Sequence, residues 1–174
     1  MFINNLKKMG DTEIAKALVV SKARKLSKQI EGNKDPSALM RQARNIYDVS
    51  KQHPLAKPLA KLATTATERA ISLERKYEQI AEQVVRNGEC VNGKSGRFTQ
   101  MVQRRGYAQA LVRNVEIEVG AKKFHKLVDL GSVQYTAEFF VAKYMPFAVS
   151  AELLNSVHCL LASVEKLNAL KEAA

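Results

Sequence analysis

One stretch of the sequence matches a nucleotide-binding motif. Residues 88–95 read Gly-Glu-Cys-Val-Asn-Gly-Lys-Ser, the pattern in which backbone N–H groups cradle phosphates and the lysine reaches the terminal ones. That chemistry needs a buried strand before the loop and a later Asp to hold magnesium. Residues 82–87 instead continue a helical pattern, and the later candidate strand, 126–129, is too short. We therefore expect a connector with an exposed Lys94 and no bound nucleoside triphosphate.

The residues of this stretch also have a structural interpretation. Gly88 suits the position after the last turn of a helix, and Asn92-Gly93 is typical of a two-residue hairpin turn. Ser95 suits the residue that caps the next helix. The sequence thus allows a small hairpin at 90–95 inside an otherwise helical chain.

Other catalytic or metal-binding patterns are weak. The chain has three histidines and two cysteines, and no pair of them has the spacing of zinc ligands. His158 and Cys159 are adjacent, so on a helix they point about 100° apart. We expect no enzymatic activity, no metal and no cofactor.

The cationic side chains are the most distinctive chemistry of the sequence. The net charge is +11, and residues 1–57 hold 12 Lys and Arg against five acids, while residues 132–174 hold three against four. An uneven surplus of this kind favours a polyanionic partner. A basic protein without such a partner is the alternative interpretation.

Arginines are strung along residues 97–113, and this residue type forks onto phosphates and stacks on bases. Helical spacing places Arg97, Arg104 and Arg105 on a shared face, and Phe98 and Tyr107 are near enough to assist. Lysines from a short helix at 121–130 and from the first long helix extend the basic set. The predicted nucleic-acid-binding residues are Arg97, Arg104, Arg105, Arg113, Lys122, Lys123, Lys22, Arg24, Lys25 and Lys28.

These residues need helices to position them, and the longest predicted helix spans residues 58–88. Pro58 suits the first turn of this helix. The apolar residues form a seam, spaced alternately four and three residues apart. Glu78 lies off this seam, among charged residues that we expect to be exposed. The seam residues are Leu59, Ala63, Ala66, Ala70, Leu73, Tyr77, Ile80 and Val84.

Shorter helices are predicted on both sides of the long one. A loose or docking arm at 1–10 precedes a helix to Glu31 capped by Asp11 or Thr12. Asp35 caps a helix from Pro36 to Gln52. Further helices are expected at 97–120, where Gly106 could kink or split the helix, and at 121–130, 132–146 (capped by Ser132) and 149–170. Alternation at 115–119 leaves a strand open there. We predict an all-α bundle of about six or seven helices around one central helix, in a single domain, 1–174, with possible sub-lobes 1–88 and 89–174.

The apolar faces of these helices predict the core. The first long helix should bury Ile14, Leu18, Val19, Ala23, Leu26 and Ile30, and the second Leu39, Ala43, Ile46, Tyr47 and Ser50. The last helix has a heptad stripe broadened by further leucines, a width that favours the middle of a bundle or a partner surface. Its stripe is Leu153, Val157, Leu160, Val164 and Leu167, with Leu154, Leu161 and Leu170 beside it.

No apolar run approaches the roughly 18 residues that span a bilayer, and no signal-peptide pattern is present. We expect a cytoplasmic protein that does not contact membranes. The leading functional hypothesis is a non-enzymatic protein that binds the backbone of RNA or DNA within a larger nucleoprotein assembly. The alternative is a structural or adaptor protein whose helices associate with copies of the chain or with a larger protein.

Overall fold

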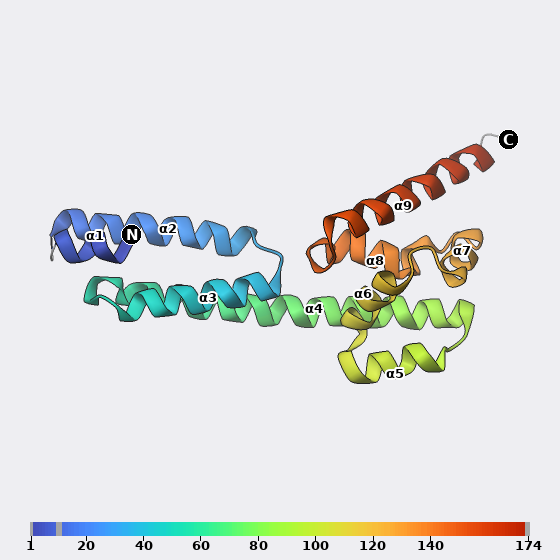
Figure 1. The fold of residues 1–174 in the computed structure, drawn as a ribbon, viewed down its shortest axis with the longest axis horizontal. Coiled ribbons are helices and arrows are strands. Elements are labelled where there is room, and N and C mark those ends of the chain that lie inside the picture. Colours follow the sequence, from blue (N-terminus) through green and yellow to red (C-terminus); the bar gives the residue numbers. More distant parts are fainter. Residues whose placement is uncertain (1, 10–11, 173–174) are drawn as a thin grey trace. The chain divides into compact units, whose positions relative to one another are not determined.

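The computed structural model describes residues 2–9 and 12–172, with side chains to residue 169. This part of the chain contains nine α-helices, three short 3₁₀ helices and no strand, which confirms the all-α fold with one long helix (Figure 1). More helices form than predicted because the N-terminal arm is helical and the segment 97–120 is divided in two. The chain falls into two compact units, Met1–Arg75 and Lys76–Ala174.

The first unit contains α1 (Phe2–Met9), α2 (Glu13–Gly32), α3 (Pro36–Lys51), the 3₁₀ helix η1 (Pro54–Leu59) and the beginning of α4 (Ala60–Asn92). The side chain of Thr12 caps α2 by accepting a hydrogen bond from the Ala15 N–H at 3.2 Å. Asp35 caps α3 in the same way, through the Ser37 N–H at 2.9 Å. Two predicted caps are therefore confirmed, while Asp11 lies outside the described residues.

The core of the first unit is built from aliphatic residues of α1, α2, α3 and η1 packed against alanines of α4. Leu6, Ile30, Leu39 and Leu59 are almost fully buried. Small side chains at three seam positions of α4 leave room for the neighbouring helices. The buried alanines are Ala63, Ala66 and Ala70.

Of the two alternatives for the N-terminal arm, residues 2–9 form the docking one, because Ile3 and Leu6 are spaced to bury one face of α1. Two other predictions for this unit were wrong. Ile14 is 67% exposed, since Ala15 and Val19 take the inward positions of α2. Tyr47 is 47% exposed, because Leu39, Ala43, Ile46 and Ser50 already fill the inner face of α3.

The second unit contains the rest of α4, α5 (Gly96–Arg105), α6 (Tyr107–Ile117), α7 (Lys122–Asp129), η2 (Val133–Tyr135), α8 (Ala137–Tyr144), η3 (Pro146–Ala148) and α9 (Ala151–Glu172). Its core gathers side chains from α4, α6, α7, α8 and α9, whereas α5 contributes no buried residue. The most deeply buried large side chains are Val115, Phe140, Val141 and Val157.

The ends of the long helix differ from the prediction. Pro58 lies in η1 rather than in the first turn of α4, and Gly88 lies inside α4. A Cβ at Gly88 would lie 3.2 Å from the Tyr135 carbonyl oxygen, so the glycine allows η2 to approach. Gly93, with φ of +73°, ends the helix instead, its N–H donating to the Glu89 carbonyl at 2.8 Å. The hairpin allowed at 90–95 is therefore absent, because residues up to Asn92 are helical. All eight seam residues are buried or half-buried.

Gly106 divides the segment 97–120 into α5 and α6. Its φ of +80° and ψ of 169° fall in a region that is essentially restricted to glycine. The Glu78 carboxylate accepts hydrogen bonds from the backbone N–H groups of Tyr107, at 2.5 Å, and Ala108, at 3.0 Å. Glu78 is thus a half-buried cap for α6 and not a solvated charge. Residues 115–117 continue α6, so the alternation there does not form a strand.

The C-terminal helices agree only in part with the prediction. Thr136, not Ser132, caps α8 by accepting from the Phe139 N–H at 3.2 Å. In α9, Val157 and Val164 are buried, but Leu167 is 54% exposed. The predicted stripe is therefore buried or half-buried from Leu153 to Val164 and exposed at Leu167, and the side chain of Leu170 lies outside the described residues.

We predict that Gly106→Ala lowers the free energy of unfolding by about 2–4 kcal/mol, since the new Cβ forces a disfavoured backbone region and displaces the capping carboxylate. That Cβ would lie 2.8 Å from Glu78 Oε1. Gly93→Ala is the control, because Gly93 also has positive φ but nothing within 4 Å of its Cβ position. It should cost about 1–2 kcal/mol. Equal losses in urea unfolding would show that Glu78 does not govern this junction.

Candidate nucleic-acid interface

Helix α5 carries three of the predicted binding residues, all of them arginines. Arg97, Arg104 and Arg105 are all exposed, and no acid occurs between residues 90 and 115. Arg97 and Arg104 are two turns apart and share a face, with Arg105 one position further round. Phe98, Met101 and Val102 are half-buried, and by helical spacing they lie on the side of α5 next to the arginines. The helix therefore presents its guanidinium groups to solvent.

Arg113 does not extend this face. The break at Gly106 places it on α6, and its guanidinium pairs with the Glu116 carboxylate at 3.0 Å. Because its charge is already compensated and its helix runs in another direction (Figure 1), we regard Arg113 as the weakest member of the predicted set.

The remaining predicted cations divide between the two units. Lys122 and Lys123 are exposed at the start of α7 in the second unit. In the first unit, Arg24, Lys25 and Lys28 are exposed on α2. Lys22 is half-buried, its ammonium 5.8 Å from the centre of the Phe2 ring. These cations lie in two different units and form two basic groups, one on α2 and one on α5 and α7.

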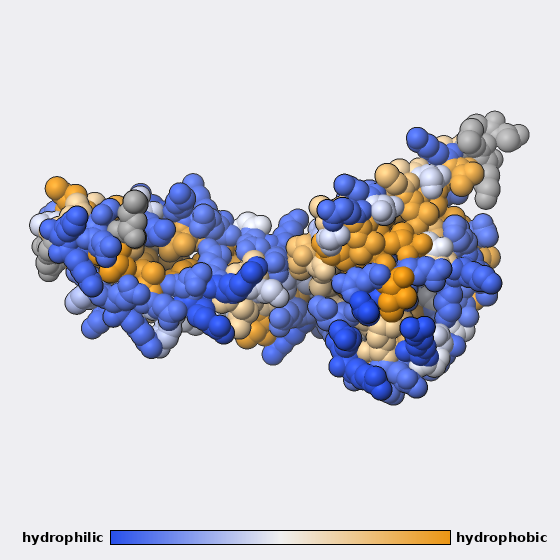
Figure 2. All heavy atoms as spheres, in the orientation of Figure 1, coloured by the Kyte–Doolittle hydropathy of each residue, from blue (hydrophilic) through white to orange (hydrophobic). Residues whose placement is uncertain are grey.

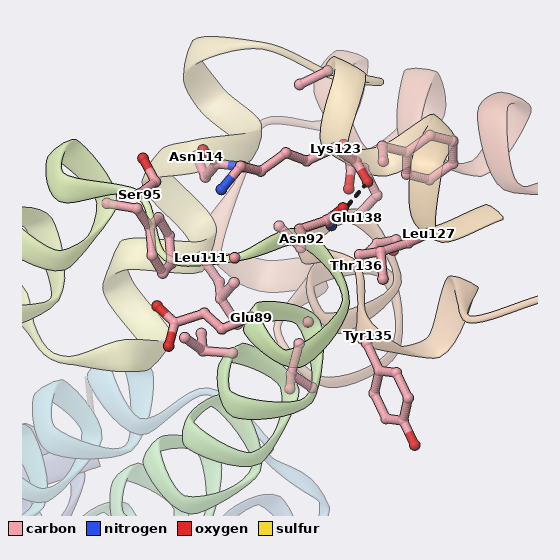
Figure 3. A pocket seen from close by; sticks show the side chains of 18 residues that line it. Glu89, Asn92, Ser95, Leu111, Asn114, Lys123, Leu127, Tyr135, Thr136 and Glu138 are labelled. Atoms are coloured by element: carbon pink, nitrogen blue, oxygen red, sulfur yellow. Dashed lines mark hydrogen bonds between the residues drawn. The ribbon is translucent and has the colours of Figure 1, made fainter. Parts of the chain in front are cut away.

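A cavity of about 230 Å³ in the second unit brings the beginnings of α5 and α7 together (Figure 3). Ser95 and Phe98 line it from the α5 side, and Lys123 and Phe124 from the α7 side. Aliphatic side chains of α4, α6 and α7 complete much of its wall: Val84, Val85, Leu111 and Leu127.

Glu138 is the most unusual residue of the cavity wall. It belongs to α8, is only 2% exposed, and its Oε1 accepts a hydrogen bond from the Gly120 N–H at 3.0 Å. Burial raises the pKa of the Glu138 carboxyl above its ordinary 4.5, while backbone N–H donors, including that of Gly120, oppose the rise. Within the described residues the carboxylate has no ion-pair partner.

Asn92, the last residue of α4, contributes a second acceptor. Its amide nitrogen donates to the Lys123 carbonyl at 3.3 Å, tying the end of α4 to α7. Its Oδ1 is buried and has no hydrogen-bond partner within the described residues. Buried polar atoms without a partner are uncommon in folded proteins, so this oxygen marks the cavity as a place where a donor would be accommodated.

The nucleotide-motif stretch borders this cavity but does not form a phosphate loop. Residues up to Asn92 are helical, so their N–H groups are used within α4 and do not converge on one point. Lys94 is exposed, as predicted. Ser95 occupies the capping position of α5, although its side chain makes no capping hydrogen bond.

Comparison with known protein families, curated proteins and solved structures finds no match to this chain. Across the described residues, no helix is sufficiently long and apolar to cross a bilayer. The same part of the chain holds no group of three or more His, Cys, Asp or Glu side chains that could bind a metal ion.

Sequence reasoning missed Glu78, Asn92 and Glu138. Glu138 had a visible signal, since it is a lone acid in the apolar run from Ala137 to Val141, and acids are rarely buried without a specific reason. Glu78 and Asn92 had no such signal, because their roles depend on contacts with residues about 30 positions away.

We predict that Glu138→Gln changes how stability depends on pH. The pKa of the buried acid is higher in the folded than in the unfolded protein, so the native chain loses stability as pH rises from about 4.5 through the raised pKa. Each unit of that rise corresponds to about 1.4 kcal/mol. The stability of Glu138→Gln relative to the native chain, measured by urea unfolding, should therefore increase as pH rises from about 4.5 through the raised pKa. A pH-independent difference would contradict the assignment.

Proposed function

We propose that this protein binds the sugar–phosphate backbone of RNA or DNA, without enzymatic activity, as a small subunit of a larger nucleoprotein assembly. The main support for this proposal is that the three arginines of α5 are exposed, have no acidic residues near them in the sequence and lie on a helix that contributes no buried residue. Figure 2 shows strongly hydrophilic side chains over this helix.

The energetics of α5 support a partner of opposite charge. Arg104 and Arg105 lie in its last turn, where the helix dipole favours cations by about 0.3–1 kcal/mol, so part of their placement is structural. Arg97 lies in the first turn, where the same dipole disfavours a cation. Its position is not explained by helix stability, whereas a phosphate held near that end would be favoured by both the arginine and the helix.

The basic group of α2 supplies a second contact region. Four cations within residues 22–28 repel one another on an exposed helix by some tenths of a kcal/mol per close pair, and the described structure gives Arg24, Lys25 and Lys28 no acidic partner. Two separate basic groups suit an extended polyanion better than a small anion.

Binding should fall steeply between about 50 and 200 mM salt, because each neutralised phosphate releases counterions. The double variant Arg104→Glu and Arg105→Glu should weaken binding at least several-fold and reduce the salt dependence. Gel-shift titration with a short single-stranded RNA and the matching DNA measures both effects.

The matched control is Lys143→Glu with Lys166→Glu, two exposed lysines of α8 and α9. It changes the net charge equally without touching α2, α5 or α7. Equal loss of affinity in both double variants would mean that only net charge matters and would remove the assignment to α5. No binding to either nucleic acid at low salt would remove the proposal itself.

A second candidate function is self-association or packing on a larger protein through α9. Leu167 is 54% exposed, Leu154 and Leu161 are half-buried, and Figure 2 shows hydrophobic side chains gathered over this helix. Exposed apolar surface of this kind marks protein interfaces. A subunit that coats a nucleic acid would show both behaviours.

If α9 mediates self-association, light scattering should give a mass above that of one 19.4 kDa chain. Leu167→Glu should lower that mass, because it places a charge in the interface. Glu165→Lys, an exposed position on the same helix, serves as the control. A monomeric native chain would reject self-association.

A further inference from the structure

The cavity between the beginnings of α5 and α7 has acceptors in its wall and cations around it. Glu138 and Asn92 offer oxygen atoms, and Figure 3 shows both in the same part of the wall. Lys123 lines the cavity, and in the figure its side chain reaches toward Asn114. Lys94 and Arg97 are exposed and adjacent in sequence to lining residues. The site therefore suits a ligand with N–H donors at one end and an anion at the other.

The volume of the cavity and the residues of its wall restrict the kinds of ligand that could bind. A volume of about 230 Å³ lies below the roughly 300–1,000 Å³ of pockets that enclose drug-sized molecules, which suits one planar ring system. The wall supplies the aromatic rings of Phe98 and Phe124 and aliphatic side chains. Proteins that bind unpaired bases use the same combination, an apolar or aromatic surface for the ring and hydrogen bonds to its polar edge.

The buried carboxylate selects among the bases. Glu138 accepts one hydrogen bond from the Gly120 N–H through Oε1 and forms no ion pair within the described residues. A carboxylate favours a partner with two neighbouring N–H donors, since paired charge-assisted hydrogen bonds are the strongest available. Guanine carries such a pair, N1–H and the N2 amino group, on its Watson–Crick edge. Adenine has no N1–H, and uracil has one ring N–H between two acceptors.

We propose that this cavity holds an unpaired guanine base, with Glu138 accepting from its N1–H and N2 amino groups and the nearby cations facing its phosphate. This inference rests on the proposed function and deepens it, because it turns a backbone-contacting protein into one that also captures a single guanine of a single-stranded nucleic acid. The α5 arginines hold the adjoining backbone, and the cavity distinguishes the base.

The test uses the full chain and isothermal titration with GMP, AMP and IMP at low salt. GMP should bind at least tenfold more tightly than AMP, with IMP, which lacks the N2 amino group, between them. Glu138→Gln should weaken GMP binding about tenfold or more while leaving AMP unchanged. Its amide oxygen still accepts from the Gly120 N–H, so folding is retained. Glu118→Gln, a change at an exposed carboxylate, should have no effect.

A second variant tests the cavity independently of Glu138. Ser95→Phe places a ring in the cavity wall at a position whose side chain makes no capping bond, and it should reduce GMP binding as strongly. Equal binding of all three nucleotides, or GMP binding unaffected by Glu138→Gln, would overturn the guanine site. In that case gel shifts that still depend on Arg104 and Arg105 would leave the proposed function standing. Conversely, selective GMP binding without any gel shift would reject backbone binding alone.

Discussion

The Glu78 carboxylate accepts hydrogen bonds from two backbone N–H groups at the start of α6, and this contact fixes the junction between α5 and α6. A carboxylate at a helix N-terminus satisfies donors that the helix leaves open and meets the positive end of its dipole. Here it comes from α4 and caps α6, so it fixes where α6 begins. Gly106 must then reverse the chain beside that carboxylate, and this reversal separates α5 from α6. The exposed position of the α5 arginines depends on this junction.

The sequence predicted the helices because their signals are local. Thr12, Asp35 and Pro36 begin helices through contacts within three residues, and the spacing of small and apolar residues along α4 identifies its buried side. The errors arose where a distant contact decides. Gly88 is of a type that often ends a helix, but here it lies within α4 and allows the Tyr135 backbone to come close. Without knowledge of that contact, the sequence could not show whether the helix ends at Gly88 or at Gly93. Ile14 was wrongly predicted to be buried, because the packing of α2 against its neighbours, which decides that Ala15 faces the core, cannot be read from the sequence.

Of the candidate site, only the exposed arginines and lysines could be predicted from the sequence. Arginine and lysine are exposed almost wherever they occur, so their distribution along the chain already describes the basic surfaces. The cavity depends instead on Asn92, Lys123 and Glu138, which come from three helices and meet only after folding. Their arrangement also explains why the glycine-rich stretch is misleading. The stretch borders the cavity, but through the side chain of Asn92 and the end of α4, not through a loop of converging N–H groups.

The central claim is that α5 is the surface that meets nucleic acid. Titration of ¹⁵N-labelled protein with a short single-stranded oligonucleotide, followed by amide chemical shifts, tests it directly. We expect the largest shifts in Gly96–Arg105 and at the start of α7, with smaller ones on α2. Shifts concentrated on α9, or spread evenly over every exposed lysine and arginine, would contradict it.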